Sequence, residues 1–152
     1  MTDTAETPDG YRGRLRPLLG SPISDVSQPS EASMPDDVYD HPEWHAGPER
    51  TGYRATVAAL RRARGRPQAL ITIFRAVPEG KEILPGDWVS VARPFARGHA
   101  VAHPWEHWRI VSRRVPASEV RWAGTDLMEW GWFPDLPDVV RPGLERDGRG
   151  LG

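Results

Sequence analysis

Residues 69–77 read ALITIFRAV, a β-branched apolar run that ends directly before a proline. β-branched and aromatic side chains favour extended backbone, so this run is the clearest predicted strand of the chain. Successive side chains of a strand point to opposite faces, which places Arg75 with Ile73 and opposite Phe74. A guanidinium on an apolar face is costly unless it is paired or faces a cleft. Arg75 is therefore a strand-edge residue reaching water, the partner of a core carboxylate, or an anion-binding residue.

Outward from this run, the remaining patterns predict a small sheet and two helices. Residues 51–64 repeat apolar side chains at helical spacing, with Thr51 as the expected N-cap, and residues 94–102 begin with a proline that suits a first helical turn. Further strands are predicted at 87–91, 108–115, 120–122 and 127–132. Strands outnumber helices and do not alternate regularly with them, so we expect an α+β fold with a small mixed or antiparallel sheet and a few short helices.

The two ends of the chain differ in composition from its centre. The chain contains 16 prolines and 15 glycines in 152 residues, and 13 of these 31 lie in residues 1–33 and 136–152. Residues 1–33 and 136–152 have few large apolar side chains whose burial would offset the entropy of ordering, so both are predicted to be disordered tails. The folded domain is expected to span residues 34–135. Its first segment, 34–44, is predicted to be an irregular loop anchored by Val38, Tyr39 and Trp44.

Charge and composition exclude several kinds of site. The formal net charge is −1, so no strong nucleic-acid signal is present. The absence of cysteine excludes disulfides, thiolate zinc sites and a cysteine nucleophile. No stretch approaches the roughly 20 apolar residues of a membrane span, and the N-terminus lacks the regions of a signal peptide. We therefore expect no membrane partner and a cytoplasmic location.

Two residues differ in character from their surroundings. Ser90 lies in GDWVSV (86–91), a turn that leads into a predicted strand. Glu129 lies among the bulky apolar side chains of DLMEWGW (126–132), where a carboxylate indicates either a salt bridge or a site. Gly131 would allow a close approach to the backbone there. Each residue taken alone also has a structural explanation.

One group of histidines and one run of arginines are further candidate sites. His99, His103 and His107 are spaced by four, as metal ligands on one helix would be, but Pro104 breaks that helix, so we predict no metal site. The arginine-rich run at 61–66 is either a phosphate-contacting surface or, more simply, the solvated end of a helix.

The order and context of Arg75, Ser90 and Glu129 resemble the Arg–Ser–Glu arrangement of mono-ADP-ribosyltransferase folds, in particular the small versions of phage and prophage proteins. The similar segments are HPEW, FRAVP, GDWVS, ARPFARGH, VPASEV and DLMEWGW, which together span residues 41–133. The resemblance implies a domain that binds NAD as its substrate and transfers ADP-ribose to an acceptor. The acceptor, protein or nucleic acid, is not identified by the sequence.

The resemblance also implies a role for each residue. Glu129 would be catalytic, because a fixed carboxylate stabilises the positive charge that develops at C1′ of the ribose as nicotinamide leaves. Arg75 would bind the phosphate or ribose side of NAD, and Ser90 would support the nicotinamide pocket and position Glu129. Trp88 or Trp130 would stack on the nicotinamide or adenine ring, although a role as a structural anchor explains both indoles better.

The chain departs from the family pattern at two positions. Ser90 is flanked by Val89 and Val91 instead of standing in a Ser-Thr-Ser element. Leu127 takes the place of the second Glu of arginine-modifying members, so arginine is not implied as the acceptor. An inactive relative or an NAD glycohydrolase fits the same residues. The alternative from another class is a non-catalytic phage-type accessory module that docks a partner through a Trp-rich surface.

Overall fold

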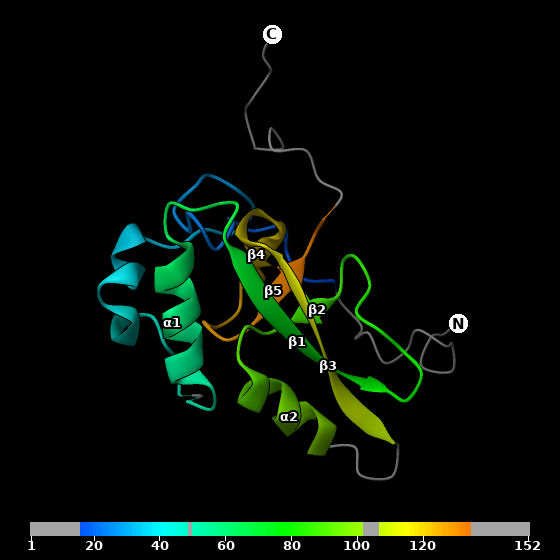
Figure 1. The fold of residues 1–152 in the computed structure, drawn as a ribbon. Helices are drawn as coiled ribbons and strands as arrows, with labels where there is room; N and C mark the ends of the chain where they lie inside the picture. Colours follow the sequence, from blue (N-terminus) through cyan, green and yellow to red (C-terminus); the bar gives the residue numbers. More distant parts are fainter. Residues whose placement is uncertain (1–15, 49, 102–106, 135–152) are drawn as a thin grey trace, which may run out of the picture.

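The computed structural model describes residues 16–48, 50–101 and 107–134, without the side chains of residues 99–101. Helices and antiparallel strands combine in this part of the chain, which confirms the predicted α+β fold (Figure 1). In chain order the elements are the 3-10 helices η2 (Asp36–Tyr39) and η3 (Pro42–Trp44), α1 (Tyr53–Ala63), β1 (Leu70–Pro78), β2 (Trp88–Val89), α2 (Arg93–Val101), β3 (Trp108–Pro116), the 3-10 helix η4 (Ala117–Glu119), β4 (Val120–Trp122) and β5 (Trp130–Trp132). None of the described helices has the length and apolar character needed to cross a membrane.

The strands form two antiparallel groups that meet at β1. β1 pairs with β3 along its whole length, and β5 lies between β2 and β4 in a three-stranded group. A bridge between Phe74 of β1 and Ser90, just after β2, joins the two groups through reciprocal backbone hydrogen bonds of 2.8 and 2.9 Å. The strand predicted at 69–77 is confirmed as β1, and the bridge makes β1 the element that links the two groups.

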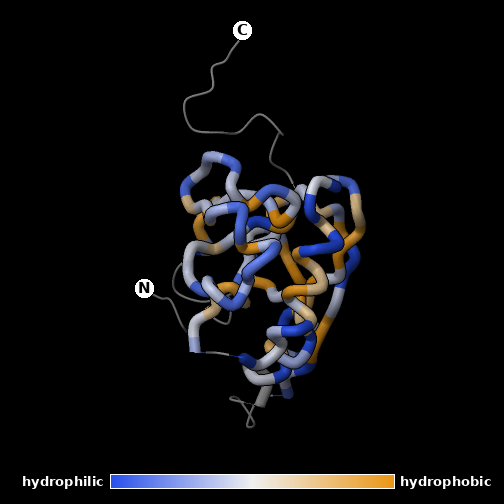
Figure 2. The backbone as a smooth tube through the Cα atoms, turned by 90° about the vertical axis from the view of Figure 1, so that its left-hand side faces the viewer, coloured by the Kyte–Doolittle hydropathy of each residue, from blue (hydrophilic) through white to orange (hydrophobic). Residues whose placement is uncertain are grey.

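The core lies between these strands and α1. Ile73, Leu60 and Trp130 are fully buried, and they belong to one continuous cluster of apolar side chains. Figure 2 shows apolar stretches running through the middle of the molecule, with hydrophilic loops around them. The strand alternation predicted for β1 is confirmed, because Ile71, Ile73, Arg75 and Val77 are buried while Thr72 and Phe74 are only half-buried.

The predicted domain boundary at residue 34 is wrong, because residues 16–33 pack into the fold. Ile23 and Val26 are fully buried, and the N–H of Ile23 donates to the carbonyl of Val120 at 2.8 Å. The hydroxyl of Tyr39 donates to the carbonyl of Ile23 (2.7 Å) and accepts from the N–H of Val26 (3.0 Å). A few apolar residues at the right positions therefore order a segment whose average composition predicts disorder. The predicted tails 1–15 and 136–152 lie outside the described residues.

Residues 34–44 differ from the predicted loop in form and in one anchor. They contain η2 and η3, in which Val38 and Tyr39 are buried as predicted. Trp44 is 63% exposed and stacks on His41, with ring centroids 3.9 Å apart, so its prediction as an anchor is wrong. Its indole makes its stacking contact within the loop and not in the core.

The ends of the other elements shift by a few residues from their predictions. α1 begins at Tyr53 after Gly52, whose φ of +81° is left-handed, and not after a Thr51 side-chain cap. β2 and β5 are shorter than the segments predicted at 87–91 and 127–132. The remaining helix and strands agree with the predicted segments to within one residue.

Candidate functional site

Arg75 is held inside the molecule. Its side chain is 9% exposed, its Nη1 donates to the carbonyl of Trp88 at 2.7 Å, and its Nε lies 3.7 Å from Oδ2 of Asp87. The Asp87 carboxylate is itself buried and also accepts from the N–H of Leu84 at 2.8 Å. Of the roles open to Arg75 from the sequence, partnership with a core carboxylate is the one its contacts display. The Arg75–Asp87 pair holds the turn before β2 against β1.

Ser90 shapes the corner between β2 and α2. Its side chain is buried, and its Oγ donates to the carbonyl of Ala92 (2.7 Å) and accepts from the N–H of the same residue (3.2 Å). The start of α1 packs against this corner, since a Cβ on Gly52 would lie 2.7 Å from the Cβ of Ala92. The Ser90 hydroxyl therefore fixes a bend in the backbone at a place where two helices begin.

Glu129 lies half-buried between two buried neighbours at the start of β5. Its Oε1 accepts from Oγ1 of Thr125 at 2.5 Å. On one side Met128 is buried, and its sulfur accepts from Oγ1 of Thr56 on α1 at 3.3 Å. On the other side Nε1 of Trp130 donates to the carbonyl of Leu127 at 2.9 Å. These contacts hold the backbone at Glu129 firmly while its carboxylate keeps partial contact with solvent.

Ser90 and Glu129 lie at the same end of one strand pair. In the antiparallel pairing of β2 with β5, Trp88 is opposite Gly131 and Val89 is opposite Trp130. The pairing ends there, so that Ser90 directly follows Val89 and Glu129 directly precedes Trp130. Ser90 also bridges to Phe74 of β1, which places Phe74 beside the same end of the β2–β5 pair. We call these three residues the Ser90–Glu129 row.

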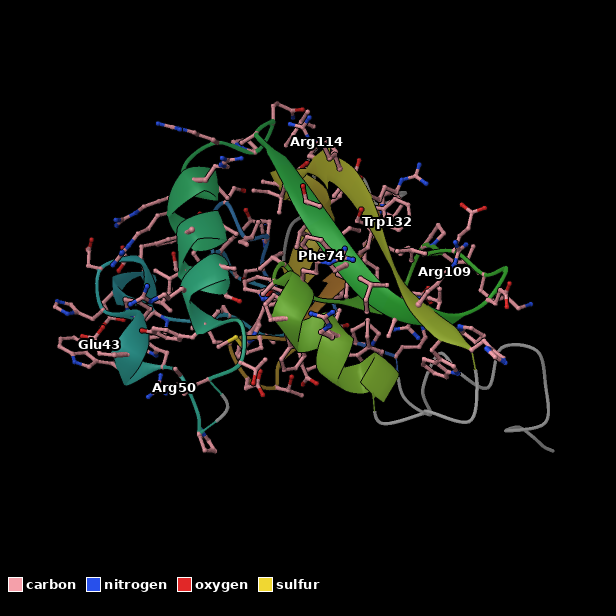
Figure 3. All side chains as sticks on the ribbon, turned by 60° about the horizontal axis from the view of Figure 1, so that its bottom comes forward. Glu43, Arg50, Phe74, Arg109, Arg114 and Trp132 are labelled. Carbon is pink, nitrogen blue, oxygen red and sulfur yellow. The ribbon has the colours of Figure 1, made fainter. Side chains whose placement is uncertain are left out.

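Arg75 lies next to this row along the chain but on the other face of the sheet. It follows Phe74 directly in β1, so its side chain points to the opposite side, toward the apolar core. The face that contains Phe74 is covered by α2, which packs on β1 and β3 (Figure 3). The structure thus places Ser90 and Glu129 at one end of the β2–β5 pair, and it directs the Arg75 side chain to the face of β1 opposite Phe74.

Trp88 and Gly131 belong to the same neighbourhood. Trp88 is half-buried and, being two residues from Ser90, shares its face of β2. The close approach predicted at Gly131 is made by the chain itself, because a Cβ there would lie 2.7 Å from Phe133 and 2.9 Å from Pro17. Gly131 therefore serves internal packing.

The arginine run at 61–66 is the solvated end of a helix, in agreement with the simpler of its two interpretations. Arg61 donates through Nε to the carbonyl of Tyr39 at 3.0 Å. Arg64 pairs with Asp40 at 3.3 Å and lies over the Tyr39 ring, 4.7 Å from its centroid. These contacts hold η2 against the end of α1.

Two histidine–carboxylate pairs in the η2–η3 region are not predicted from the sequence. Nε2 of His45 lies 2.6 Å from Oδ1 of Asp37, and Nδ1 of His41 lies 3.3 Å from Oε2 of Glu43. A hydrogen bond from its own backbone, followed by the contact with His41, lowers the pKa of the Glu43 carboxyl. The alternation of acids and histidines in DDVYDHPEWH (36–45) is the sequence signal that was available.

No group of three or more metal-ligating side chains is assembled among the residues that the structure describes. The side chain of His99 and the whole of His103 lie outside those residues, so the predicted absence of a metal site is not decided there. Comparisons with known protein families, with curated proteins and with solved structures find no match for this chain.

Proposed function

We propose that this chain is an ADP-ribosyltransferase-like domain that binds NAD as substrate at the Ser90–Glu129 row. The observation that supports the proposal is the position of Ser90 and Glu129 at the same end of the β2–β5 pair, although the two residues are far apart in the sequence. A serine that fixes a corner beside a half-buried carboxylate is the arrangement that the resemblance requires of these two residues.

In this proposal the carboxylate of Glu129 stabilises the transition state. Cleavage of the bond between the nicotinamide nitrogen and C1′ leaves the electron pair on nicotinamide and positive charge on the ribose. A carboxylate fixed beside C1′ stabilises that charge, and the acceptor's nucleophilic atom then bonds to C1′ and loses its proton. Thr125, which donates to Oε1 of Glu129, keeps the carboxylate in one orientation. Trp88 shares the Ser90 face and is the candidate for stacking on a ring of NAD.

Arg75 takes a different part from the one that the family resemblance implies. Because its guanidinium is engaged by Asp87 and by the Trp88 carbonyl, we assign it to positioning and not to NAD binding. It holds β2 beside β1, and with it the segment that contains Ser90. Loss of Arg75 would then act on NAD through the placement of Ser90.

NAD binding is tested by thermal unfolding of the purified chain with and without millimolar NAD. A ligand that binds only the native state raises the melting temperature, and we expect this rise in the wild type and in Glu129→Gln. Ser90→Ala should reduce the rise, since it loosens the corner beside Glu129, whereas the exposed Glu82→Gln is the matched control and should keep it. If NAD leaves the melting temperature of the wild type and of every variant unchanged, the proposal is overturned.

The second candidate is the non-catalytic docking module, and one observation favours it. Trp44 is 63% exposed and stacked on His41, so its indole is accessible to a partner. Among the other tryptophans that the structure describes, Trp88, Trp108 and Trp122 are half-buried, and Trp130 and Trp132 are buried. If this module is the function, Trp44→Ala should abolish partner capture and leave both the melting temperature and any NAD effect unchanged.

A further inference from the structure

The outer side of β3 has no strand partner among the residues that the structure describes. β3 lies beside β1 for its whole length, and residues 109–115 form no backbone hydrogen bond outside that ladder within the described chain. β3 is therefore an edge strand. Edge strands present N–H and C=O groups to which a second extended chain can add.

The bridge on the other side of β1 determines which groups of β3 point outward. Phe74 uses both its N–H and its C=O to pair with Ser90, so these groups point away from β3. Phe74 and its β3 partner Ser112 are then a non-hydrogen-bonded pair, and the N–H and C=O of Ser112 point away from β1. The pattern repeats every second residue, so Ile110 and Arg114 also present their backbone groups outward.

The side chains of β3 give this edge a positive charge. Arg109, Arg113 and Arg114 are exposed, and the strand contains no carboxylate. Within the described residues none of the three forms an ion pair, and the Arg113 guanidinium lies over the Trp132 ring, 4.8 Å from its centroid. Arg109 and Arg114 lie toward the two ends of the strand (Figure 3). An added strand would therefore meet arginines along its whole length.

We propose that β3 binds an extended acidic segment of a partner protein by strand addition. The partner's backbone pairs with Ile110, Ser112 and Arg114, and its Asp or Glu side chains pair across the strands with the arginines. A second copy of β3 is a poorer occupant, because two such strands bring together two sets of arginines and no carboxylate. The edge faces away from the Ser90 side of β1, so the proposal does not depend on NAD binding.

The test uses a labelled peptide in which Glu and Val alternate, with a Lys–Val peptide as the charge control, and fluorescence anisotropy as the readout. Ser112→Pro removes one outward N–H and no hydrogen bond to β1. Proline is tolerated at such a position, where the N–H of an edge strand faces away from the neighbouring strand. Ser112→Ala keeps that N–H. We expect Ser112→Ala to bind the Glu–Val peptide as the wild type does, and Ser112→Pro to bind it at least about tenfold more weakly.

A second variant keeps the test decisive if Ser112→Pro lowers the melting temperature. Arg109→Glu combined with Arg113→Glu changes two exposed side chains on one face of β3, the face on which the Glu side chains of an alternating peptide can meet both. This variant should transfer the preference from the Glu–Val to the Lys–Val peptide. Equal binding of both peptides by the wild type, or no binding of either, overturns the proposal. Self-association that Ser112→Pro abolishes would assign the edge to a second copy, and binding of single-stranded DNA in place of the peptide would assign it to nucleic acid; either result overturns it as well.

Discussion

At the scale of single residues, the interior of the fold depends on a few polar side chains whose partners are specific. Arg75 and Asp87 are both buried, so each carries a desolvation cost that the other offsets. Tyr39 joins η2 to the N-terminal segment through two hydrogen bonds at one hydroxyl. Both arrangements predict losses of stability that are larger than those of surface substitutions.

Arg75→Met should destabilise the fold by about 3–5 kcal/mol, because it leaves the Asp87 carboxylate buried without its cation. Adding Asp87→Asn, which keeps an oxygen for the Leu84 N–H, should recover part of that loss. Urea unfolding of the two single variants and the double variant gives the coupling, expected at about 1–3 kcal/mol. Additive losses would show that the two side chains do not act as a pair.

Burial raises the pKa of Tyr39 from 10.0 to about 12, which gives the fold a specific alkaline sensitivity. The unfolded chain loses this proton first as pH rises, so the associated stability is complete below pH 10 and is lost between pH 10 and 12. The loss is on the order of 2 kcal/mol. Tyr39→Phe should be less stable at neutral pH by about 2 kcal/mol and should show a smaller fall over this range in urea unfolding. A parallel fall in both proteins contradicts this assignment.

At the scale of elements, the corner where α1 meets Ala92 tolerates no side chain at Gly52. Gly52 has a φ of +81°, and a Cβ there would lie 2.7 Å from the Cβ of Ala92. Gly65 has a similar φ of +70° with nothing within 4 Å of its Cβ position, so it serves as the matched control for backbone strain alone.

Gly65→Ala should therefore cost about 1 kcal/mol in the free energy of unfolding, and Gly52→Ala about 1–3 kcal/mol more. Chemical denaturation of the two variants measures the difference directly. Equal losses would mean that α1 moves away from the corner without cost.

The elements also show how far the sequence predicts this structure. β1 follows from a β-branched run whose apolar side chains both favour extended backbone and fill the core, and β3 follows from the alternation in WRIVSRRV. β2 and β5 are two and three residues long, and their ends depend on pairing with each other, which no local pattern encodes. The face of Arg75 follows from strand period, but its partner Asp87 lies beyond a turn and could be found only in three dimensions.

At the scale of the whole molecule, the N-terminal segment, residues 16–33, contributes buried side chains to the core. Residues 16–33 were expected to be disordered because their mean composition is polar, yet Ile23 and Val26 are fully buried. Their contribution depends on long-range contacts with β4 and Tyr39, and not on any local propensity. In the same way, the position of Ser90 and Glu129 at one end of the β2–β5 pair depends on the pairing of distant segments and not on any local pattern.

Ile23→Ala should destabilise the fold by about 2–5 kcal/mol, as expected for a large side chain removed from a closed core. Leu84→Ala, at a residue that is 39% exposed, is the control and should cost much less. Thermal unfolding of both variants suffices. Similar melting temperatures for the two would show that residues 16–33 do not belong to the cooperative unit.

The most direct test of the account as a whole is the release of nicotinamide from NAD by the purified chain, measured for the wild type, Glu129→Gln and the exposed control Glu82→Gln. If the Ser90–Glu129 row is a catalytic site, the wild type and Glu82→Gln release nicotinamide at the same rate. Glu129→Gln should then be slower by a factor on the order of 100, as when a single group that stabilises transition-state charge is removed. If Glu129→Gln releases nicotinamide as fast as the wild type, Glu129 is not catalytic. If none of the three proteins releases nicotinamide, the catalytic role of Glu129 is contradicted as well, whether or not the proteins bind NAD.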